Sequence, residues 1–304
     1  MKKHLLALAV LSALCVAKAH ANTTINGFAS IKAGMTTSSD ENLYGYGSEL
    51  DFKTGSLFAL QVKSDLGEKL SVTGQLLGRG VDDFNVQLEW LYLSYQLSND
   101  LVINAGRLGV PFFTYSDFKD VGYAYLWNTA PQSVYSGVGF TSVEGVSLYY
   151  TTDLGSFDAS MQLLYGSSSD NNPLFGQPAS GRYEQVLSLN MVLSRDWYSF
   201  RAAYVEGNIT VSADAFSPLT DALFNTNIPA FQALAAELDF NEDKGTFYGI
   251  GVLLEPGNWN IVFEYNDIGI EKSFYSDRTN FYISAGYRFD QWQPYVVYER
   301  QDHK

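Results

Sequence analysis

The chain has few of the residues that disulfide, metal and histidine chemistry require. It holds one cysteine and three histidines in 304 residues, and Cys15, His4 and His20 all lie within the first 20. If this leader is removed, the remaining chain has no thiol and a single imidazole, His303. A lone imidazole cannot build a Ser-His-Asp triad or a histidine-ligated zinc site. We therefore expect no catalytic residues, no metal site and no cofactor.

The leader has the three parts of a secretory signal peptide. Lys2 and Lys3 supply the positive start, residues 5–16 the apolar stretch, and Ala19 with Ala21 the small-residue cleavage site. The apolar stretch is about half of the roughly 20 residues that a membrane-spanning helix needs. The sequence predicts cleavage after Ala21, which divides the chain into a signal peptide (1–21) and one mature domain (22–304).

Long apolar runs and prolines are also scarce. After the leader no apolar run reaches the roughly 18 residues of a membrane helix, while 15% of all residues are aromatic and only eight are proline. This composition suits long β-strands. An exported protein that lives in lipid without such helices has one available architecture, a closed β-barrel. The net charge of −14, or −17 without Lys2, Lys3 and Lys18, argues against nucleic acid as a partner.

Tight and wide joints alternate along the mature chain. Amphipathic runs of about ten residues are joined by tight turns at 66–69, 98–100, 153–156, 194–197, 255–258 and 290–293. Wide, acidic and aromatic-rich segments separate them at 35–47, 80–85, 109–143, 166–182, 207–245 and 266–277. Short turns on one side and long loops on the other are typical of an antiparallel up-and-down β-barrel in a bacterial outer membrane, with the tight turns in the periplasm.

The runs themselves alternate as barrel strands should. In residues 157–165 every odd position is apolar and most even positions are polar. A water-soluble β-sandwich would show the same period, so alternation alone does not decide between the two folds. Trp197, Trp259 and Trp292 all fall at or beside tight turns, where one membrane interface would lie. We therefore predict an all-β transmembrane barrel.

Counting the runs predicts thirteen strands, near 23–34, 57–66, 70–79, 86–97, 101–109, 144–153, 157–166, 183–193, 198–206, 246–254, 259–266, 278–289 and 294–300. Two of them, 86–97 and 101–109, are apolar on both faces and cannot be phased. Two explanations for their apolar character are open. Either the segment 109–143 folds into the lumen and shields the inner wall beside these strands from water, or the outer face of these strands contacts another subunit.

The odd count has a consequence for closure. Bacterial single-chain barrels have even strand numbers, and an open edge in lipid leaves backbone groups unsatisfied. Thirteen strands could close only through a parallel pair between the first and the last. We instead expect a truncated barrel that lacks roughly three strands.

Several motifs resemble those of Gram-negative outer-membrane porins. Asp-Leu-Gly turns occur at 65–67 and 153–155, and a long third loop follows the strand end Ala105-Gly106-Arg107-Leu108-Gly109. The stretch 110–125, with Tyr-Ser-Asp at 115–117 and Asp-Val-Gly-Tyr-Ala-Tyr at 120–125, is similar to a poorly characterised porin-like branch. The resemblance implies a sixteen-stranded homotrimer whose third loop narrows each pore. The acidic Pro-Glu-Phe-Gly-Gly motif of general porins is absent.

The predicted pore constriction combines third-loop residues with arginines of the strands. Its members are Asp117, Asp120, Tyr115, Tyr123, Tyr125, Arg79, Arg107, Arg182 and Arg201. The two carboxylates would supply negative field, and the tyrosines, with Trp127 and Tyr135, a packing or sugar-stacking surface. The alternative is an extracellular cap whose aromatic residues pack on one another.

Other charges are expected to line the lumen or the loops. The alternation along each strand predicts which charged side chains face the lumen. They are Lys32, Lys63, Arg79, Arg182, Arg201, Arg288, Asp65, Asp158, Glu184, Glu264 and Glu299. Because the two signs are similar in number, no strong ion selectivity follows. In the longest loop, the sequence after Asn227 predicts a short amphipathic helix on the barrel mouth. Acidic pairs such as Asp82 and Asp83, or Asp239, Glu242 and Asp243, are either solvated surface or calcium sites.

These observations predict a homotrimeric outer-membrane channel for passive diffusion of small hydrophilic solutes, in contact with lipid and lipopolysaccharide. One alternative is a substrate-selective channel, for example for oligosaccharides. Another is a pore-less structural or adhesin barrel. A barrel enzyme is disfavoured because His303 is the one histidine outside the leader.

Overall fold

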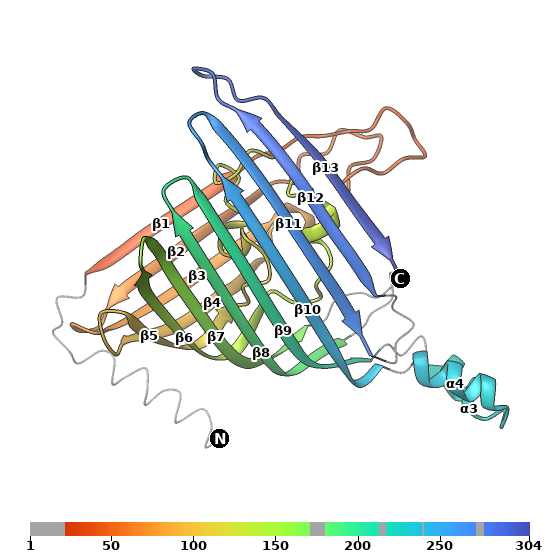
Figure 1. Ribbon diagram of the computed structural model, residues 1–304. Coiled ribbons are helices and arrows are strands. Elements are labelled where there is room, and N and C mark those ends of the chain that lie inside the picture. Colours follow the sequence, from red (N-terminus) through yellow and green to blue (C-terminus); the bar gives the residue numbers. More distant parts are fainter. Residues whose placement is uncertain (1–21, 171–179, 213–216, 239, 272–276) are drawn as a thin grey trace.

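The computed structural model describes residues 22–170, 180–212, 217–238, 240–271 and 277–304, so the predicted signal peptide lies outside the described residues. One sheet contains thirteen strands in sequence order, and each pairs antiparallel with the next. The strands are β1 (Thr23–Ser30), β2 (Leu57–Asp65), β3 (Leu70–Arg79), β4 (Val86–Gln96), β5 (Leu101–Gly109), β6 (Ser142–Leu154), β7 (Phe157–Asp170), β8 (Ser180–Arg195), β9 (Tyr198–Ser212), β10 (Phe240–Leu254), β11 (Trp259–Ile270), β12 (Arg278–Tyr287) and β13 (Tyr295–His303). The predicted all-β antiparallel fold is confirmed (Figure 1).

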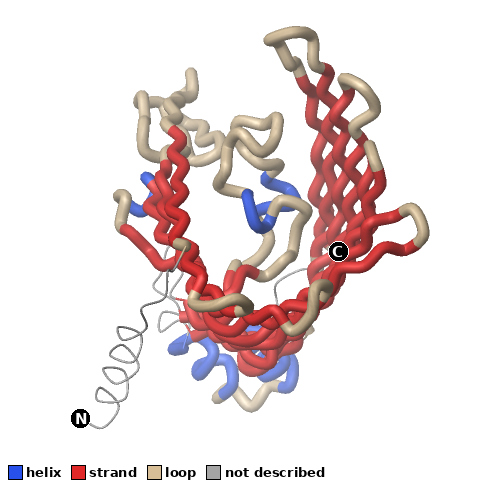
Figure 2. Tube along the Cα trace, turned by 90° about the vertical axis from the view of Figure 1, so that its left-hand side faces the viewer, coloured by secondary structure: helices blue, strands red, loops and turns tan. Residues whose placement is uncertain are grey.

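The sheet curls into a deep trough with loops inside it (Figure 2). Among the described residues, β1 pairs only with β2 and β13 only with β12, so these two strands border the opening of the trough. The sheet is therefore a barrel wall that does not close on itself. The expected total of sixteen strands stays a prediction.

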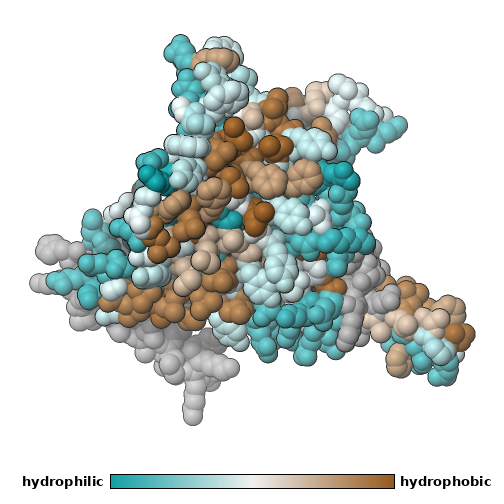
Figure 3. Space-filling view, in the orientation of Figure 1, coloured by the Kyte–Doolittle hydropathy of each residue, from teal (hydrophilic) through white to brown (hydrophobic). Residues whose placement is uncertain are grey.

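Alternation along each strand separates an inner face from an outer face. On β12, Tyr282 and Ser284 are fully buried beneath the loops inside the trough, whereas Ile283 between them is exposed. Figure 3 shows the apolar side chains of the outer face gathered in a diagonal band across the strands, with hydrophilic residues on both sides. Such a band is what a bilayer requires of a barrel.

Aromatic side chains mark both borders of this band. Trp197, Trp259 and Trp292 are exposed at or beside the tight turns, as predicted. Toward the other ends of the strands, Tyr165 and Tyr248 are exposed on the outer face. Two aromatic girdles are the usual interface anchors of outer-membrane barrels. Within the described residues, no helix is long and apolar enough to cross a membrane.

A β-bulge explains why residues 86–97 could not be phased. The register between β3 and β4 shifts where Gln75 pairs with Trp90 and Leu76 with Leu88, which leaves Glu89 as an extra residue. An inserted residue reverses the alternation on its own strand. Leu88 and Leu91 are consequently both exposed on the outer face, although they are three residues apart.

In the described residues, five short helices lie in the connections: the 3-10 helices η1 (Gly80–Asp82) and η2 (Ser116–Phe118), and the α-helices α2 (Gln132–Tyr135), α3 (Ser217–Phe224) and α4 (Pro229–Leu238). The predicted helix after Asn227 is confirmed as α4, and α3 was not foreseen. The two helices form a hairpin that extends away from the sheet (Figure 1), rather than lying on the mouth as predicted.

Candidate functional site

The segment between β5 and β6, residues 110–141, lies inside the trough, and we call it loop 3. Its two ends are joined by a hydrogen bond from the backbone N–H of Val110 to the carbonyl of Thr141, at 2.9 Å. Figure 2 shows loop segments and short helices filling the space inside the curved sheet. Loop 3 is therefore placed to contact opposite walls of the lumen.

One side of loop 3 is sealed to the wall by apolar packing. Phe112, Phe113, Trp127 and Val134 of the loop form a buried cluster with inward-facing side chains of β9 to β12, namely Val205, Phe247, Val262, Ile268 and Tyr282. The rings of Trp127 and Tyr282 meet edge to face, with centroids 5.3 Å apart. Aromatic pairs of this kind each contribute about 0.5–1.5 kcal/mol beyond the burial of their area. The loop is thereby anchored, and water is excluded from this side.

A buried carboxylate on β11 fixes the same side of the loop. Glu264 is 3% exposed and accepts hydrogen bonds from the backbone N–H of Thr114 at 2.8 Å and the hydroxyls of Tyr135 and Tyr282. Burial, and then the neighbouring Glu264, raise the pKa of Tyr135 well above its ordinary value, so this phenol remains a donor. Removing such an acceptor would leave several buried donors unpaired.

A buried arginine completes the anchor. Arg201 on β9 is 9% exposed, and its guanidinium donates to the carbonyls of Pro111, in a short contact, and of Phe112, at 3.0 Å. Backbone carbonyls thus solvate the cation in place of water. The inward phase predicted for Arg201 is what the structure shows.

The opposite wall holds loop 3 through ions. Arg79 at the end of β3 lies 2.8 Å from the Asp120 carboxylate and 3.4 Å from Glu89. Nearby, the Lys32 ammonium donates to the carbonyl of Asn128. Lys119, beside Asp120, is buried enough that desolvation lowers its pKa, and the charge of Asp120 opposes that shift. Loop 3 is therefore fastened to both sides of the lumen.

A cavity of about 300 Å³ remains between loop 3 and residues 31–56, which we call loop 1. Three cations, one carboxylate and four tyrosines line it: Lys32, Arg79, Lys119, Asp120, Tyr44, Tyr46, Tyr125 and Tyr135. The inner wall of β2 to β5 carries polar pairs, with hydrogen bonds of 3.1 Å between Gln75 and Gln61 and of 2.7 Å between Ser94 and Asn104. Apolar packing therefore lies on one side of loop 3, and polar side chains lie on the other.

Comparison with known proteins identifies the family. A family profile of Gram-negative porins matches residues 7–304. The chain belongs to the Gram-negative porins. The solved structure of Salmonella typhi OmpF in complex with daunomycin is 15% identical in sequence to this porin and has a TM-score of 0.59. The aligned region covers 93% of this porin and 79% of the OmpF chain.

A second similar structure is the outer-membrane channel DcaP of Acinetobacter baumannii. It is 13% identical in sequence and has a TM-score of 0.56, and the aligned region covers 94% of this porin and 80% of the DcaP chain. At these identities the likeness shows the shared fold alone. No curated protein matched the sequence. The porin family and these neighbours place the protein in the bacterial outer membrane.

The predicted third-loop residues have different surroundings in this porin. Tyr115 is buried, with its ring 5.9 Å from that of Tyr125 and 5.4 Å from that of Trp127. Asp120 and Tyr125 line the cavity. Tyr123 is 84% exposed and Asp117, in η2, is also exposed. The structure brings Asp120, Tyr125 and Arg79 together, and keeps Tyr115 in the packing that supports them.

Arg107, predicted to be part of the pore constriction, lies on the outer face. It pairs across the strands with Glu144, at 2.9 Å, while the adjacent pair of Leu108 and Val143 is buried inside. The sequence could not reveal this because β5 carries apolar residues on both of its faces. Leu108 packs in the cluster under loop 3 rather than in lipid.

Arg182 and Glu184 also face outward, which corrects their predicted phase. The register between β8 and β9 shifts between Glu184 and Leu187, and Gln185 has a φ of 53°. Beyond this bulge Tyr183 points inward, with its ring 4.3 Å from Phe140 of loop 3. Its neighbours on the strand therefore point toward the outside.

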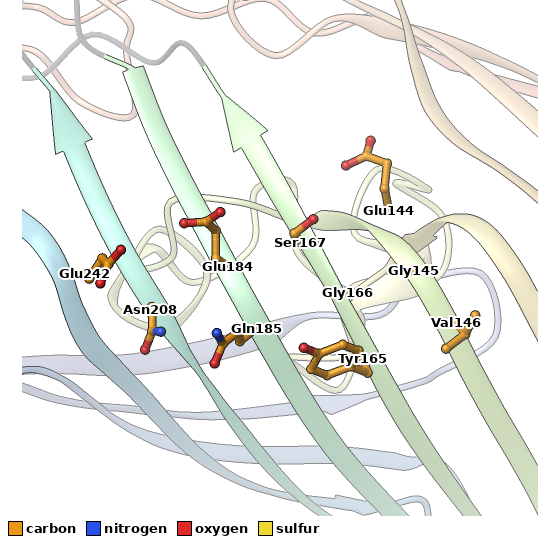
Figure 4. Close-up of a pocket in the computed structure, with 10 residues that line it drawn as sticks. All are labelled: Glu144, Gly145, Val146, Tyr165, Gly166, Ser167, Glu184, Gln185, Asn208 and Glu242. Carbon is orange, nitrogen blue, oxygen red and sulfur yellow. The ribbon is translucent and has the colours of Figure 1, made fainter.

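The outward glutamates border a second cavity of about 580 Å³ on the outer face of β6 to β10. Figure 4 shows Glu144, Glu184 and Glu242 around it, above Tyr165. In the described ranges, no group of three or more histidine, cysteine or acidic side chains is placed to hold a metal ion. Asp239, one of the acids considered for calcium, lies outside the described residues.

Sequence reasoning did not include loop 1 or Lys119 in the constriction. Lys32 was expected to face inward, but Tyr44 and Tyr46 were part of a loop noted only for its aromatic content. Their approach to loop 3 depends on contacts between residues far apart in the chain, such as Lys32 with Asn128, whose separation is 96 residues. Such contacts leave no short-range pattern.

Proposed function

We propose that this porin is a channel for passive diffusion of small hydrophilic solutes, narrowed by loop 3. The observation that carries the proposal is that loop 3 is fastened to both walls of the lumen, by Glu264 and Arg201 on one side and by Arg79 on the other. A loop that is held at both ends and in the middle keeps a fixed position, so it narrows the lumen by a constant amount. Its polar residues then act as a filter for size and charge.

The arrangement also supports a route. Because aromatic and aliphatic side chains seal loop 3 to β9–β12, hydrated solutes would pass on the opposite side. There they would meet the polar pairs on the inner wall of β2 to β5 and the cavity between loops 1 and 3. Polar lining replaces part of a solute's hydration, which lowers the free-energy cost of entering the narrowed lumen.

We further propose that the porin assembles as a homotrimer and that its outer face meets lipid and lipopolysaccharide. The family implies the trimer. The apolar band between two rows of aromatic residues supports the contact with lipid.

A selective channel for a class of nutrients is the second candidate. The four tyrosines that line the cavity favour it, since a general pore needs no such concentration of aromatic hydroxyl groups. Conductance that saturates and is blocked by one solute class would support selectivity over general diffusion.

The proposal is tested by reconstituting folded full-length protein into planar bilayers and liposomes. We expect discrete conductance steps and swelling rates that fall as the mass of an uncharged sugar rises. Circular dichroism and heat-modifiable gel mobility serve to establish that the reconstituted protein is folded. Folded protein that gives neither conductance steps nor swelling contradicts the channel function.

A further inference from the structure

We propose that the cavity between loop 1 and loop 3 is a binding subsite for small hydroxylated organic anions, such as sugar acids. The inference rests on the proposed channel function and gives it a solute class. It follows from the charges, the hydroxyl groups and the size of this one cavity.

The cationic groups of the cavity outnumber its carboxylates. Lys32, Arg79 and Lys119 line it, together with Asp120 alone among acidic residues. Asp120 is already engaged by Arg79 at 2.8 Å. Lys32 donates to a neutral carbonyl, and neither lysine forms an ion pair in the part of the chain that the structure describes. Two ammonium groups are therefore available to a carboxylate of a solute.

Carboxylates at the edge of the cavity are occupied by protein donors. The carboxylate of Glu89, on β4, lies 3.4 Å from the guanidinium of Arg79. Glu299 of β13 accepts from the hydroxyl of Tyr44 at 3.3 Å and from the backbone N–H of Ser133 at 2.9 Å. The N–H of Ser133 belongs to the first turn of α2, which has no intrahelical acceptor. These acids are thus committed to holding the walls and are not directed at the solute.

Most of the other lining residues carry a hydroxyl or amide group, and Gly55, Leu57, Val81 and Ala130 complete the lining. Besides the four tyrosines, the lining contributes Ser30, Thr54, Ser56, Thr129 and Gln132. Each can both donate and accept, as the hydroxyl groups of a sugar do. The volume of about 300 Å³ is at the lower end of small-molecule sites, whose volumes are about 300–1,000 Å³. A single six-carbon acid fits that size better than an oligosaccharide.

Lys32 and Tyr46 come together over Gly55 of loop 1. A Cβ on Gly55 would lie 2.5 Å from the Tyr46 hydroxyl oxygen and 2.8 Å from Lys32 Cδ. The absence of a side chain at Gly55 therefore leaves room for both side chains on the cavity wall. This contact brings an ammonium-bearing side chain and a phenol hydroxyl to the same part of the lining.

The test uses the full chain, folded in detergent and reconstituted, with gluconate as the anion and sorbitol as its neutral counterpart of similar size. The variants are Lys119→Met and Lys32→Met, which keep side-chain length and remove charge. Lys63→Met is the matched control, because Lys63 is on β2 but does not line the cavity. The readouts are block of chloride current and, separately, the calorimetric heat of gluconate binding.

We expect saturable block and binding by gluconate, neither by sorbitol, and an affinity about three- to tenfold weaker in the two cavity variants. Lys63→Met should bind as the parent does. Equal effects of gluconate and sorbitol, or equal losses in all three variants, overturn the subsite. In that case conductance steps would still support the channel. Conversely, gluconate binding lost in Lys119→Met, in protein that does not conduct, would support the subsite and contradict the channel.

Discussion

The Arg79 guanidinium lies 2.8 Å from the Asp120 carboxylate, which ties the inner wall of β3 to loop 3. Both side chains are largely buried, so the pair is less screened than a surface ion pair. Across the lumen, the same loop is held by the buried carboxylate of Glu264. The position of loop 3 therefore depends on an ionic contact on one wall and on packing and hydrogen bonds on the other.

Arg79→Gln should loosen loop 3 from the β3 wall. Asp120 would lose its partner, and we expect a loss of about 1–3 kcal/mol in the free energy of unfolding together with noisier single-channel currents. Asp120→Asn should give a similar loss, and the double variant less than the sum. Arg107→Gln is the matched control, since its pair with Glu144 is on the outer face. Equal effects of Arg79→Gln and Arg107→Gln would contradict this assignment.

Glu264→Leu should destabilise the porin more than any loss of a surface acid. Three donors, from Thr114, Tyr135 and Tyr282, would be left without their acceptor inside the wall. We expect a cost of about 3–5 kcal/mol, seen as a lower temperature in heat-modifiable gel mobility. Glu144→Leu, at an exposed position on β6, should leave that temperature nearly unchanged. A Glu264→Leu protein as stable as the parent would show that the loop is not anchored there.

Two substitutions at Trp127 should separate the contribution of packing to stability from that of its hydrogen bond. Its indole N–H donates to the Ser284 hydroxyl at 2.9 Å, and its ring is buried against Tyr282 and Tyr115. Trp127→Phe should cost about 1–2 kcal/mol through the lost bond and volume, and Trp127→Ala about 3–5 kcal/mol. Denaturant unfolding measured by tyrosine fluorescence would give both values. A Trp127→Ala protein that loses no more than the phenylalanine variant would contradict the dry seal.

The overall fold followed from the sequence because each of its signals is local. These signals are alternating polarity, tight turns, and tryptophans such as Trp259 and Trp292 at or beside those turns. Each depends on residues that are near one another in the chain. The thirteen strands and the helix that begins at Pro229 were found in this way. Arg107 and Arg182 were assigned to the wrong face for a different reason. A strand apolar on both faces hides its phase, and one bulge at Gln185 reverses it.

The candidate site could be predicted only in part. Asp120 and Tyr125 were found because they lie on the long third loop, and Arg79 because its strand has a clear phase. The meeting of Lys32 with loop 3 depends on tertiary contacts, which no periodic pattern encodes. The charge balance of the cavity was likewise hidden. Counting inward charges over all strands gave nearly equal numbers, whereas the cavity itself gathers three cations around Asp120.

The charge of Lys119 should make the solute preference depend on pH. Burial lowers the pKa of this amine from its usual 10.5, against the opposing charge of Asp120. Block by gluconate should therefore weaken as the pH rises through a window below 10.5, earlier than an exposed lysine would allow. In the same window the unfolded chain holds this proton and the folded protein has released it, so stability rises with pH. Lys119→Met should lose both effects, and a parent block that stays constant up to pH 10.5 would contradict them.

The helical hairpin of α3 and α4 should be dispensable for conduction. The two helices pack on each other and extend away from the sheet, and none of the cavity-lining residues belongs to them. Replacing residues 217–238 by a short Gly-Ser linker should leave the conductance steps, gluconate block and unfolding temperature as in the parent. Exposed Phe224 and Phe231 would be removed, which should also reduce aggregation in detergent. Loss of conduction in a folded variant would show that the hairpin, and not loop 3 alone, shapes the route of the solute.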